Sequence, residues 1–229
     1  EAALTEQGIL LTLRSGNTAT VLEEVCRSVN AKAVYCSRQY QPWAGQLEQS
    51  LRDKLSQHDV ALKRYPGTLL HEPEAVATGA GTPFKVFTPF WRACLRRPDP
   101  QMPLATPTLS PCPTPVQSET LNSWNLLPTE PNWAHGWEDL WCPGEDGAHA
   151  ALEQFLAHHV IDYGDGRDIP SARSTSRLSP YLRFGNISPR QVWHAAQASK
   201  VFEPEASSAT DKFLSEVGWR EFCYHLLFH

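Results

Sequence analysis

The sequence predicts an α/β domain followed by an all-α domain, and three observations support that fold class. Short apolar runs alternate with amphipathic helical patterns over residues 9–97. Prolines then crowd residues 98–131, and apolar residues at helical spacing follow to the end of the chain. Strands that alternate with helices form parallel sheets with right-handed crossovers. We therefore expect a doubly wound parallel sheet that lacks its first strand, joined by a long Pro-rich connector to the first part of a helical domain.

The predicted α/β domain covers residues 1–97. Hydrophobic periodicity predicts elements in the order strand, helix, strand, helix, strand: Ile9–Leu13, Ala19–Asn30, Ala33–Tyr35, Trp43–Gln57 and Val60–Tyr65. A period of about two residues is typical of strands, and one of about 3.6 residues is typical of helices. Thr88 and Pro89 suit the cap and first turn of a further helix that ends at Leu95.

Residues 98–144 form the predicted connector. Prolines recur throughout positions 98–131, with serine and threonine between them. Because proline lacks the backbone N–H that helices and sheets need, this density excludes long regular elements. We expect four tryptophans to hold the connector against a domain surface: Trp124, Trp133, Trp137 and Trp141. For residues 98–120 the alternative is a partly disordered linker.

Residues 145–229 are the predicted N-terminal part of a helical domain. Apolar residues recur at helical spacing over His149–Asp162. Ser188 is the predicted cap of a helix over residues 189–199, which opens with a proline. A last helix is predicted over Asp211–Phe228.

Composition favours a soluble, cytoplasmic protein. Of the 229 residues 41% are hydrophobic, and the formal net charge is −5. No apolar run approaches the roughly 18 residues that a membrane span requires. The six cysteines form no C-x-x-C pair, which predicts reduced thiols and no metal site. The chain opens at Glu1 without a methionine and closes on an apolar helical pattern, so we expect it to be truncated at both ends.

Residues 167–190 concentrate positive charge, with five arginines against the single acid Asp168. The hydroxyls of residues 174–176 lie where a loop is predicted to become a helix. Backbone N–H groups at such a start suit the oxygens of a phosphate or pyrophosphate, and Arg177 can add a charge-assisted contact. The segment therefore predicts an anion site. The alternative is ordinary helix caps beside a solvated arginine face.

A second cluster lies on the last predicted helix. Glu216, Trp219, Arg220 and Cys223 are spaced at i, i+3, i+4 and i+7, so they share one stripe. A carboxylate, an indole and a guanidinium on one stripe can hydrogen-bond a base edge, stack on a base and hold an anion. The alternative is a Glu216–Arg220 ion pair beside a packed tryptophan.

These segments resemble the photolyase/cryptochrome family, and the class I deoxyribodipyrimidine photolyases in particular. Tyr163–Asp168 with Thr175–Arg190, and then Glu216–Phe222, are similar to the first half of that family's flavin domain. Lys85–Trp91 is similar to the end of its antenna domain. The family's signature for the first antenna strand is absent here. Its flavin ring pocket and its electron-transfer tryptophans would lie beyond the last residue, so we expect the chain by itself to be inactive.

The resemblance implies a role for each matched side chain. The ribose and pyrophosphate of FAD would be contacted by Tyr163, Thr175, Ser176, Arg177, Leu178 and Ser179. Arg167 would meet a DNA phosphate, and Arg220 would lie near both flavin and lesion. Glu216 would hydrogen-bond the flipped pyrimidine dimer and Trp219 would stack on it, so these two are the predicted catalytic residues.

The function implied by the resemblance is light-driven repair of cyclobutane pyrimidine dimers in DNA, by electron transfer from reduced FAD. The expected partner is dimer-containing DNA, not a membrane, and the full-length protein is expected to be a monomer. The alternative is a cryptochrome-like flavin photoreceptor that signals through a protein partner. A generic nucleotide-binding α/β protein is a third possibility. The sequence leaves open whether a second, antenna chromophore is a folate or a deazaflavin, and whether the lesion is a cyclobutane dimer or a (6-4) product.

Overall fold

The computed structural model describes residues 2–229, which divide into two compact units. The first unit runs to Tyr65 and resumes over Leu104–Trp137. The second consists of Pro66–Pro103 and Glu138–His229. Residues 66–97, which the sequence assigned to the α/β domain, therefore cluster with the helices. The boundaries predicted at residues 97 and 144 stay predictions about the domains of the full-length protein.

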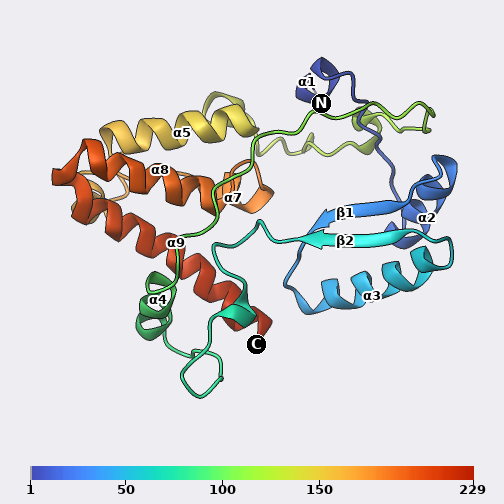
Figure 1. Ribbon diagram of the computed structural model, residues 1–229. Helices are drawn as coiled ribbons and strands as arrows, with labels where there is room; N and C mark the ends of the chain where they lie inside the picture. The colour runs from blue at the N-terminus through green and yellow to red at the C-terminus, as the bar shows by residue number, and fades with distance from the viewer. Residues whose placement is uncertain (1) are drawn as a thin grey trace. The chain divides into compact units, whose positions relative to one another are not determined.

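The first unit contains a parallel pair of strands with helices (Figure 1). Its elements are α1 (Ala2–Glu6), α2 (Thr18–Ser28), β1 (Ala33–Ser37), α3 (Pro42–Ser56) and β2 (Ala61–Tyr65). The strand register pairs Ala33 with Ala61 and ends at Ser37 with Tyr65. Buried Cys26 of α2 and Leu55 of α3 pack together with residues of the sheet. Both strands and both longer helices lie within a few residues of the positions predicted from periodicity.

The strand predicted at Ile9–Leu13 is wrong, because this segment has no regular structure. Leu10 is 83% exposed. Leu13 alone makes paired contacts, donating its N–H to Ser118 Oγ at 2.9 Å and accepting from the N–H of Glu119 at 2.8 Å. An apolar run becomes a strand only where a neighbouring backbone completes the ladder. In the described part of the chain, the connector supplies such hydrogen bonds to this segment only at Leu13.

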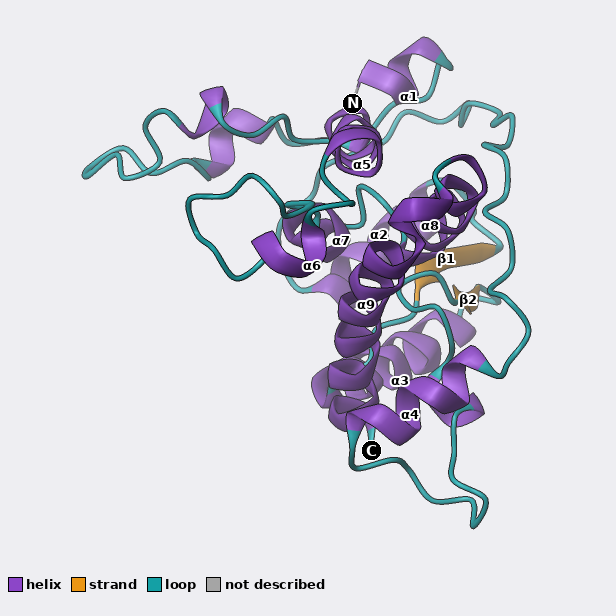
Figure 2. Ribbon diagram, turned by 90° about the vertical axis from the view of Figure 1, so that its left-hand side faces the viewer, coloured by secondary structure: helices purple, strands orange, loops and turns teal. Residues whose placement is uncertain are grey.

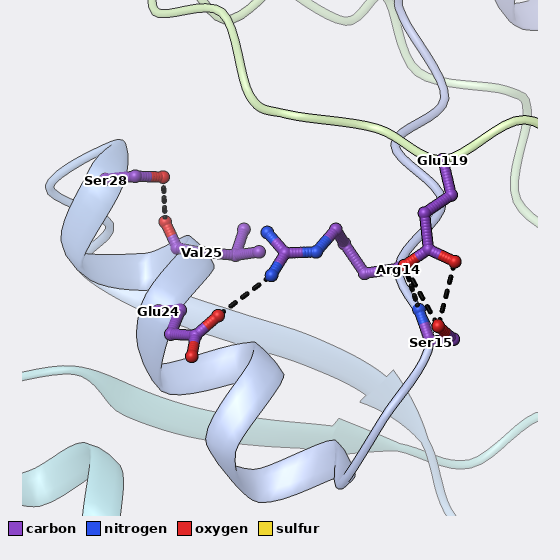
Figure 3. A network of polar contacts seen from close by, with 6 residues as sticks. All are labelled: Arg14, Ser15, Glu24, Val25, Ser28 and Glu119. Carbon is purple, nitrogen blue, oxygen red and sulfur yellow. Dashed lines mark hydrogen bonds and ion pairs between the residues drawn. The ribbon is translucent and has the colours of Figure 1, made fainter.

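Glu119 ties the connector to the segment that precedes α2, as Figure 3 shows. Its carboxylate accepts hydrogen bonds from the N–H of Ser15 at 2.8 Å and from Ser15 Oγ. It also accepts from Trp124 Nε1 at 2.6 Å, and these hydrogen bonds lower the pKa of Glu119. Next to it, Arg14 pairs with Glu24 of α2 at 2.8 Å. Glu119 is thus one of the points at which the connector is attached, and the connector is irregular apart from short 3₁₀ turns at Leu121–Trp124 and Trp137–Asp139.

The connector tryptophans do not act as one group. Trp124 is half-buried against Glu119, and Trp141 packs against the core of the second unit. Trp133 and Trp137 are 64% and 52% exposed and contact each other. The expectation that all four hold the connector to a surface is therefore wrong for Trp133 and Trp137.

The second unit is helical, and α8 and α9 run against each other within it (Figure 2). Its longer elements are α4 (Phe87–Leu95), α5 (Glu145–His158), α6 (Tyr163–Gly166), α7 (Ser179–Phe184), α8 (Pro189–Phe202) and α9 (Ser207–Phe228). Short 3₁₀ turns lie at Pro73–Ala75 and Pro204–Ala206. The main core includes Phe155, Val192 and Leu214, which are fully buried. A smaller core joins Phe90 of α4 to Phe222 of α9.

The helix starts show which sequence signals hold. Ser188 caps α8 as predicted, in a reciprocal capping box with Gln191. The predicted start of α4 at Thr88 is wrong, since the helix begins at Phe87 after Val86 and has no side-chain cap. Helix α9 begins at Ser207 and not at Asp211, and within its first turns the buried hydroxyl of Thr210 donates to the carbonyl of Ala206. No helix in residues 2–229 has both the length and the hydropathy needed to cross a bilayer.

Candidate functional site

The segment from Ser174 to Leu178 lies close against α6. Ser174 is buried, and a Cβ added at Gly166 would lie 2.1 Å from Ser174 Oγ, so only glycine allows this approach. Arg177 adopts a left-handed backbone conformation with φ of 53°. Helix α7 starts after Leu178 without a side-chain cap, and Ser176 Oγ accepts from the N–H of Leu178 at 3.4 Å. The hydroxyls of residues 174–176 therefore do not cap α7.

A cavity of about 370 Å³, here called the α9 cavity, brings the two sequence motifs together. Its lining includes Tyr163, Ser176, Leu178, Ser179, Phe213, Glu216, Val217, Arg220 and Tyr224. Residues predicted to hold FAD thus share one space with residues predicted to read DNA. The cavity thus joins positions that are forty residues apart in sequence, Ser176 and Glu216.

A larger cavity of about 720 Å³, here called the Trp141 cavity, also borders the segment that contains Thr175, Ser176 and Arg177. It is lined by residues from the connector end, α5 and the loop before α7: Asp139, Leu140, Trp141, Ala151, Gln154, Phe155, His159, Pro170, Ser171, Ala172, Arg173, Thr175, Ser176, Arg177 and Tyr181. The guanidinium of Arg177 lies over the Trp141 ring at 4.7 Å. Tyr181 donates a hydrogen bond to the carbonyl of Cys142 at 2.9 Å. Ser176 lines both cavities, so the two meet at the predicted pyrophosphate segment.

Arg167 and Glu216 form an ion pair at the α9 cavity. The Arg167 guanidinium also lies over the Tyr163 ring at 5.5 Å. The hydrogen bond with Glu216 raises the pKa of Arg167, and burial raises the pKa of Tyr163. Both side chains of the pair keep about a quarter of their surface exposed, at 24% for Arg167 and 30% for Glu216. A ligand in the cavity can therefore reach the pair without breaking the core.

Arg220 and Glu221 form a second pair, in which the carboxylate is buried. Arg220 Nη1 donates to the carbonyl of Thr68 at 2.7 Å and lies 3.3 Å from Glu221 Oε1. Glu221 Oε2 accepts from the N–H of Leu70 at 2.7 Å and from that of His71 at 3.4 Å. Burial raises the pKa of Glu221 to about 8, although the Arg220 guanidinium and both backbone N–H groups oppose this rise. The pair joins residues 68–71 to α9 and fixes the direction in which Arg220 enters the cavity.

Trp219 lines neither of the two cavities described above. Its ring stacks on Phe87 with centroids 3.9 Å apart and planes at 11°. The side chain is 44% exposed. Glu216 pairs with Arg167 and Arg220 with Glu221, so the predicted alternative of a Glu216–Arg220 pair does not describe this helix.

The structure thus distributes the predicted residues over three neighbouring places. Tyr163, Ser176, Leu178 and Ser179 meet Glu216, Arg220 and the ion-paired Arg167 around the α9 cavity. Thr175 and Arg177 lie on the Trp141 cavity, and Trp219 lies on Phe87. Sequence reasoning missed Glu221 and Phe87. Each residue lies within a segment that resembles the family, Lys85–Trp91 for Phe87 and Glu216–Phe222 for Glu221. No other sequence signal marked them, because the residues that they contact are far away in sequence.

The chain is similar to several known proteins. The DNA photolyase family profile matches residues 1–111. The deoxyribodipyrimidine photo-lyase of Agrobacterium fabrum is 39% identical over the whole chain, and cryptochrome-1 of Arabidopsis thaliana is 28% identical over 96% of it. A crystal structure described as a bacterial class III photolyase from Agrobacterium tumefaciens covers the whole chain with a TM-score of 0.94 and 39% identity.

The chain belongs to the photolyase/cryptochrome family. The expected fold class, an α/β part with a parallel sheet and a helical part, is confirmed by this match. The chain spans 47% of the Agrobacterium fabrum relative, 33% of the cryptochrome and 47% of the crystallised photolyase.

Proposed function

We propose that the full-length protein is a deoxyribodipyrimidine photolyase, a carbon–carbon lyase that repairs cyclobutane pyrimidine dimers in DNA with light. The observation that carries this proposal is the α9 cavity, where Tyr163 and Ser176 lie beside Glu216 and Arg220. A cofactor and a flipped base must meet within contact distance for such chemistry. The named relatives described as photo-lyases support the same conclusion.

The residues present fit the ribose–pyrophosphate part of FAD. The two cavities meet at Ser176, and hydroxyls of Thr175, Ser176 and Ser179 line them. Arg177 and Arg173 add positive charge beside the Trp141 cavity, against the single acid Asp139 on its wall. Hydroxyls and guanidinium groups are suitable donors for phosphate oxygens. When bound and reduced, FAD would supply the light-driven electron for the repair.

The chain's own residues would then bind and orient the lesion. Glu216 offers carboxylate oxygens to the N–H groups of a pyrimidine edge, and its partner Arg167 offers positive charge to a DNA phosphate. Trp219 offers an indole face for stacking. Arg220 carries a positive charge into the α9 cavity, where it would lie near both the flavin and the lesion.

The proposal extends to the photolyase class, the antenna chromophore, the oligomeric state and the location of the full-length protein. Because the 39%-identical crystal structure is described as class III, we place the chain nearer to that class than to the class I type expected from its motifs. We also propose a second, antenna chromophore of folate or deazaflavin type, a monomeric full-length protein and a cytoplasmic location. The free state of all six cysteines supports the last of these.

Removal of the pyrophosphate hydroxyls tests the cofactor half of the proposal. In the natural protein at full length, Thr175→Ala with Ser176→Ala should lower FAD retention by a factor of ten or more, because each lost hydrogen bond to a charged group costs about 1.5–3 kcal/mol. Flavin absorbance per mole of purified protein measures the effect. Thr106→Ala with Thr108→Ala, two exposed connector hydroxyls, is the matched control. Unchanged flavin content in the first double variant would refute the assignment.

A cryptochrome-like photoreceptor is the second candidate, because cryptochromes are among the relatives. Repair is favoured by the joint presence of Glu216, Trp219 and Arg167, since a signalling protein does not need residues that read a lesion. Trp219→Ala should weaken binding to dimer-containing DNA about tenfold, because base–aromatic stacking contributes about 1–3 kcal/mol, and should leave undamaged DNA nearly unaffected. An unmutated protein with no preference for damaged DNA would favour the cryptochrome-like photoreceptor.

A further inference from the structure

The motif Lys85–Trp91 includes Phe87, which contacts Trp219 of the proposed repair site. Phe87 is the first residue of α4, and its ring lies parallel to the Trp219 ring with centroids 3.9 Å apart. An aromatic pair in this geometry is stabilised beyond the burial of its area. Phe87 therefore covers one face of the indole that is proposed to stack on the lesion.

The position of Phe87 is itself fixed from two directions. Trp91, one turn further along α4, is stacked with Phe87 at 6.4 Å and 11°, and Phe222 of α9 meets the Phe87 ring at 65° and 6.0 Å. Trp91 in turn lies on the backbone of Gly218, where a Cβ would be 2.6 Å from its ring. Gly218 thus allows Trp91 to approach α9, and Trp91 supports Phe87.

The rings of Trp91, Phe87 and Trp219 consequently form an ordered series of parallel planes. Phe222 also contacts Trp219 at 73°, so the indole is held on one face by Phe87 and at an angle by Phe222. Yet Trp219 stays 44% exposed. An indole has two faces, and only the face opposite Phe87 remains for a ligand.

We propose that Phe87 is a positioning residue for lesion recognition: it sets the plane of the Trp219 indole, so that a flipped pyrimidine dimer stacks on the opposite face. This inference rests on the proposed function. It adds that discrimination between damaged and undamaged DNA depends on a residue of α4 that does not touch the DNA. The flat ring, and not merely the apolar volume, is required, because an aliphatic side chain leaves the indole free to tilt.

A double-mutant cycle in the natural full-length protein tests this role. Phe87→Leu keeps an apolar side chain without the ring, and Phe87→Tyr keeps the ring. The measured quantity is the ratio of dissociation constants for an undamaged oligonucleotide and the same oligonucleotide with one cyclobutane thymine dimer. Phe87→Leu should lower this ratio roughly threefold to tenfold, the range that one aromatic pair can contribute. Phe87→Tyr should keep the ratio of the unmutated protein. In a Trp219→Ala background, Phe87→Leu should cause no further fall in the ratio.

The controls separate positioning from general damage to the fold. Phe202→Leu applies the same substitution to an 82% exposed ring at the end of α8 and should leave the ratio unchanged. A normal ratio in Phe87→Leu, or an equal further loss in the Trp219→Ala background, would overturn the inference alone. If the unmutated protein does not prefer dimer-containing DNA, the proposed function fails, and this inference fails with it.

Discussion

The two arginine–glutamate pairs that involve α9 are built in contrasting ways. Arg167 and Glu216 meet across two elements at the α9 cavity, and each keeps about a quarter of its side chain exposed. Glu221 is 3% exposed, and besides Arg220 it accepts hydrogen bonds from two backbone N–H groups. One pair is accessible to a ligand, whereas the other is committed to the fold. Glu216 and Glu221 lie on the same helix, yet their surroundings differ: a ligand can reach Glu216, whereas Glu221 stabilises the fold.

The largest expected effect is on the buried pair. Glu221→Ala leaves two backbone N–H groups and the Arg220 guanidinium without their acceptor, so it should lower the free energy of unfolding by about 3–5 kcal/mol. Glu221→Gln keeps an acceptor of the same shape and should cost much less. Urea unfolding of the natural full-length protein measures both. Equal losses in the two variants would show that the hydrogen-bond acceptor is not what stabilises residues 68–71.

A second effect on stability is expected from pH, and it concerns the buried pair. Burial raises the pKa of Glu221 to about 8, whereas a carboxyl group in the unfolded chain has a pKa of about 4.3. Between these values the folded protein holds a proton that the unfolded chain has lost. The free energy of unfolding should therefore fall as pH rises through this window.

Unfolding curves at several pH values between about 4.5 and 8 measure this slope, with Glu221→Gln as the reference. The substitution removes the titrating group, so the variant should show a shallower decline than the unmutated protein. Parallel curves for the two proteins would mean that Glu221 is ionised in the fold at all these pH values.

The smallest expected effect on stability belongs to the exposed pair. Arg167→Gln should change the free energy of unfolding by no more than about 1 kcal/mol, since ion pairs with access to water contribute little. The same variant should still bind DNA more weakly, because a phosphate contact is lost. Measuring the DNA-binding constant at several salt concentrations checks this. The slope of log affinity against log salt concentration should become shallower by about 1, the value for one lost phosphate contact. If Arg167→Gln lowered the free energy of unfolding as much as Glu221→Ala, the two pairs would not differ in their contribution to stability.

Local sequence signals predicted those parts of the fold that depend on local interactions. The parallel pair of β1 and β2, and the capping box at Ser188, follow from periodicity and from side chains within three residues. Ile9–Leu13 failed because strand formation depends on a partner, and the one described here is a connector residue more than 100 positions away.

The candidate site was predictable in part for the same reason. Motif resemblance assigned Tyr163 and Ser176 to the cofactor and Glu216 to the lesion, and all three line the α9 cavity. It could not separate Arg220, which enters the cavity, from Glu221, which turns into the core one position later. That difference is set by Thr68 and Leu70, about 150 positions earlier in the chain.

Light-dependent repair by Glu216→Gln tests the central claim most directly. The natural full-length protein, reduced and illuminated with blue light, should restore thymine absorbance in an oligonucleotide with a cyclobutane dimer, and should do so only in light. At limiting DNA, Glu216→Gln should repair about tenfold more slowly because it loses a charge-assisted hydrogen bond to the lesion, while its free energy of unfolding stays within about 1 kcal/mol of the unmutated value. Glu205→Gln, an exposed acid just before α9, should repair normally. Repair by Glu216→Gln at the unmutated rate, or no light-dependent repair by the unmutated protein, would contradict the account.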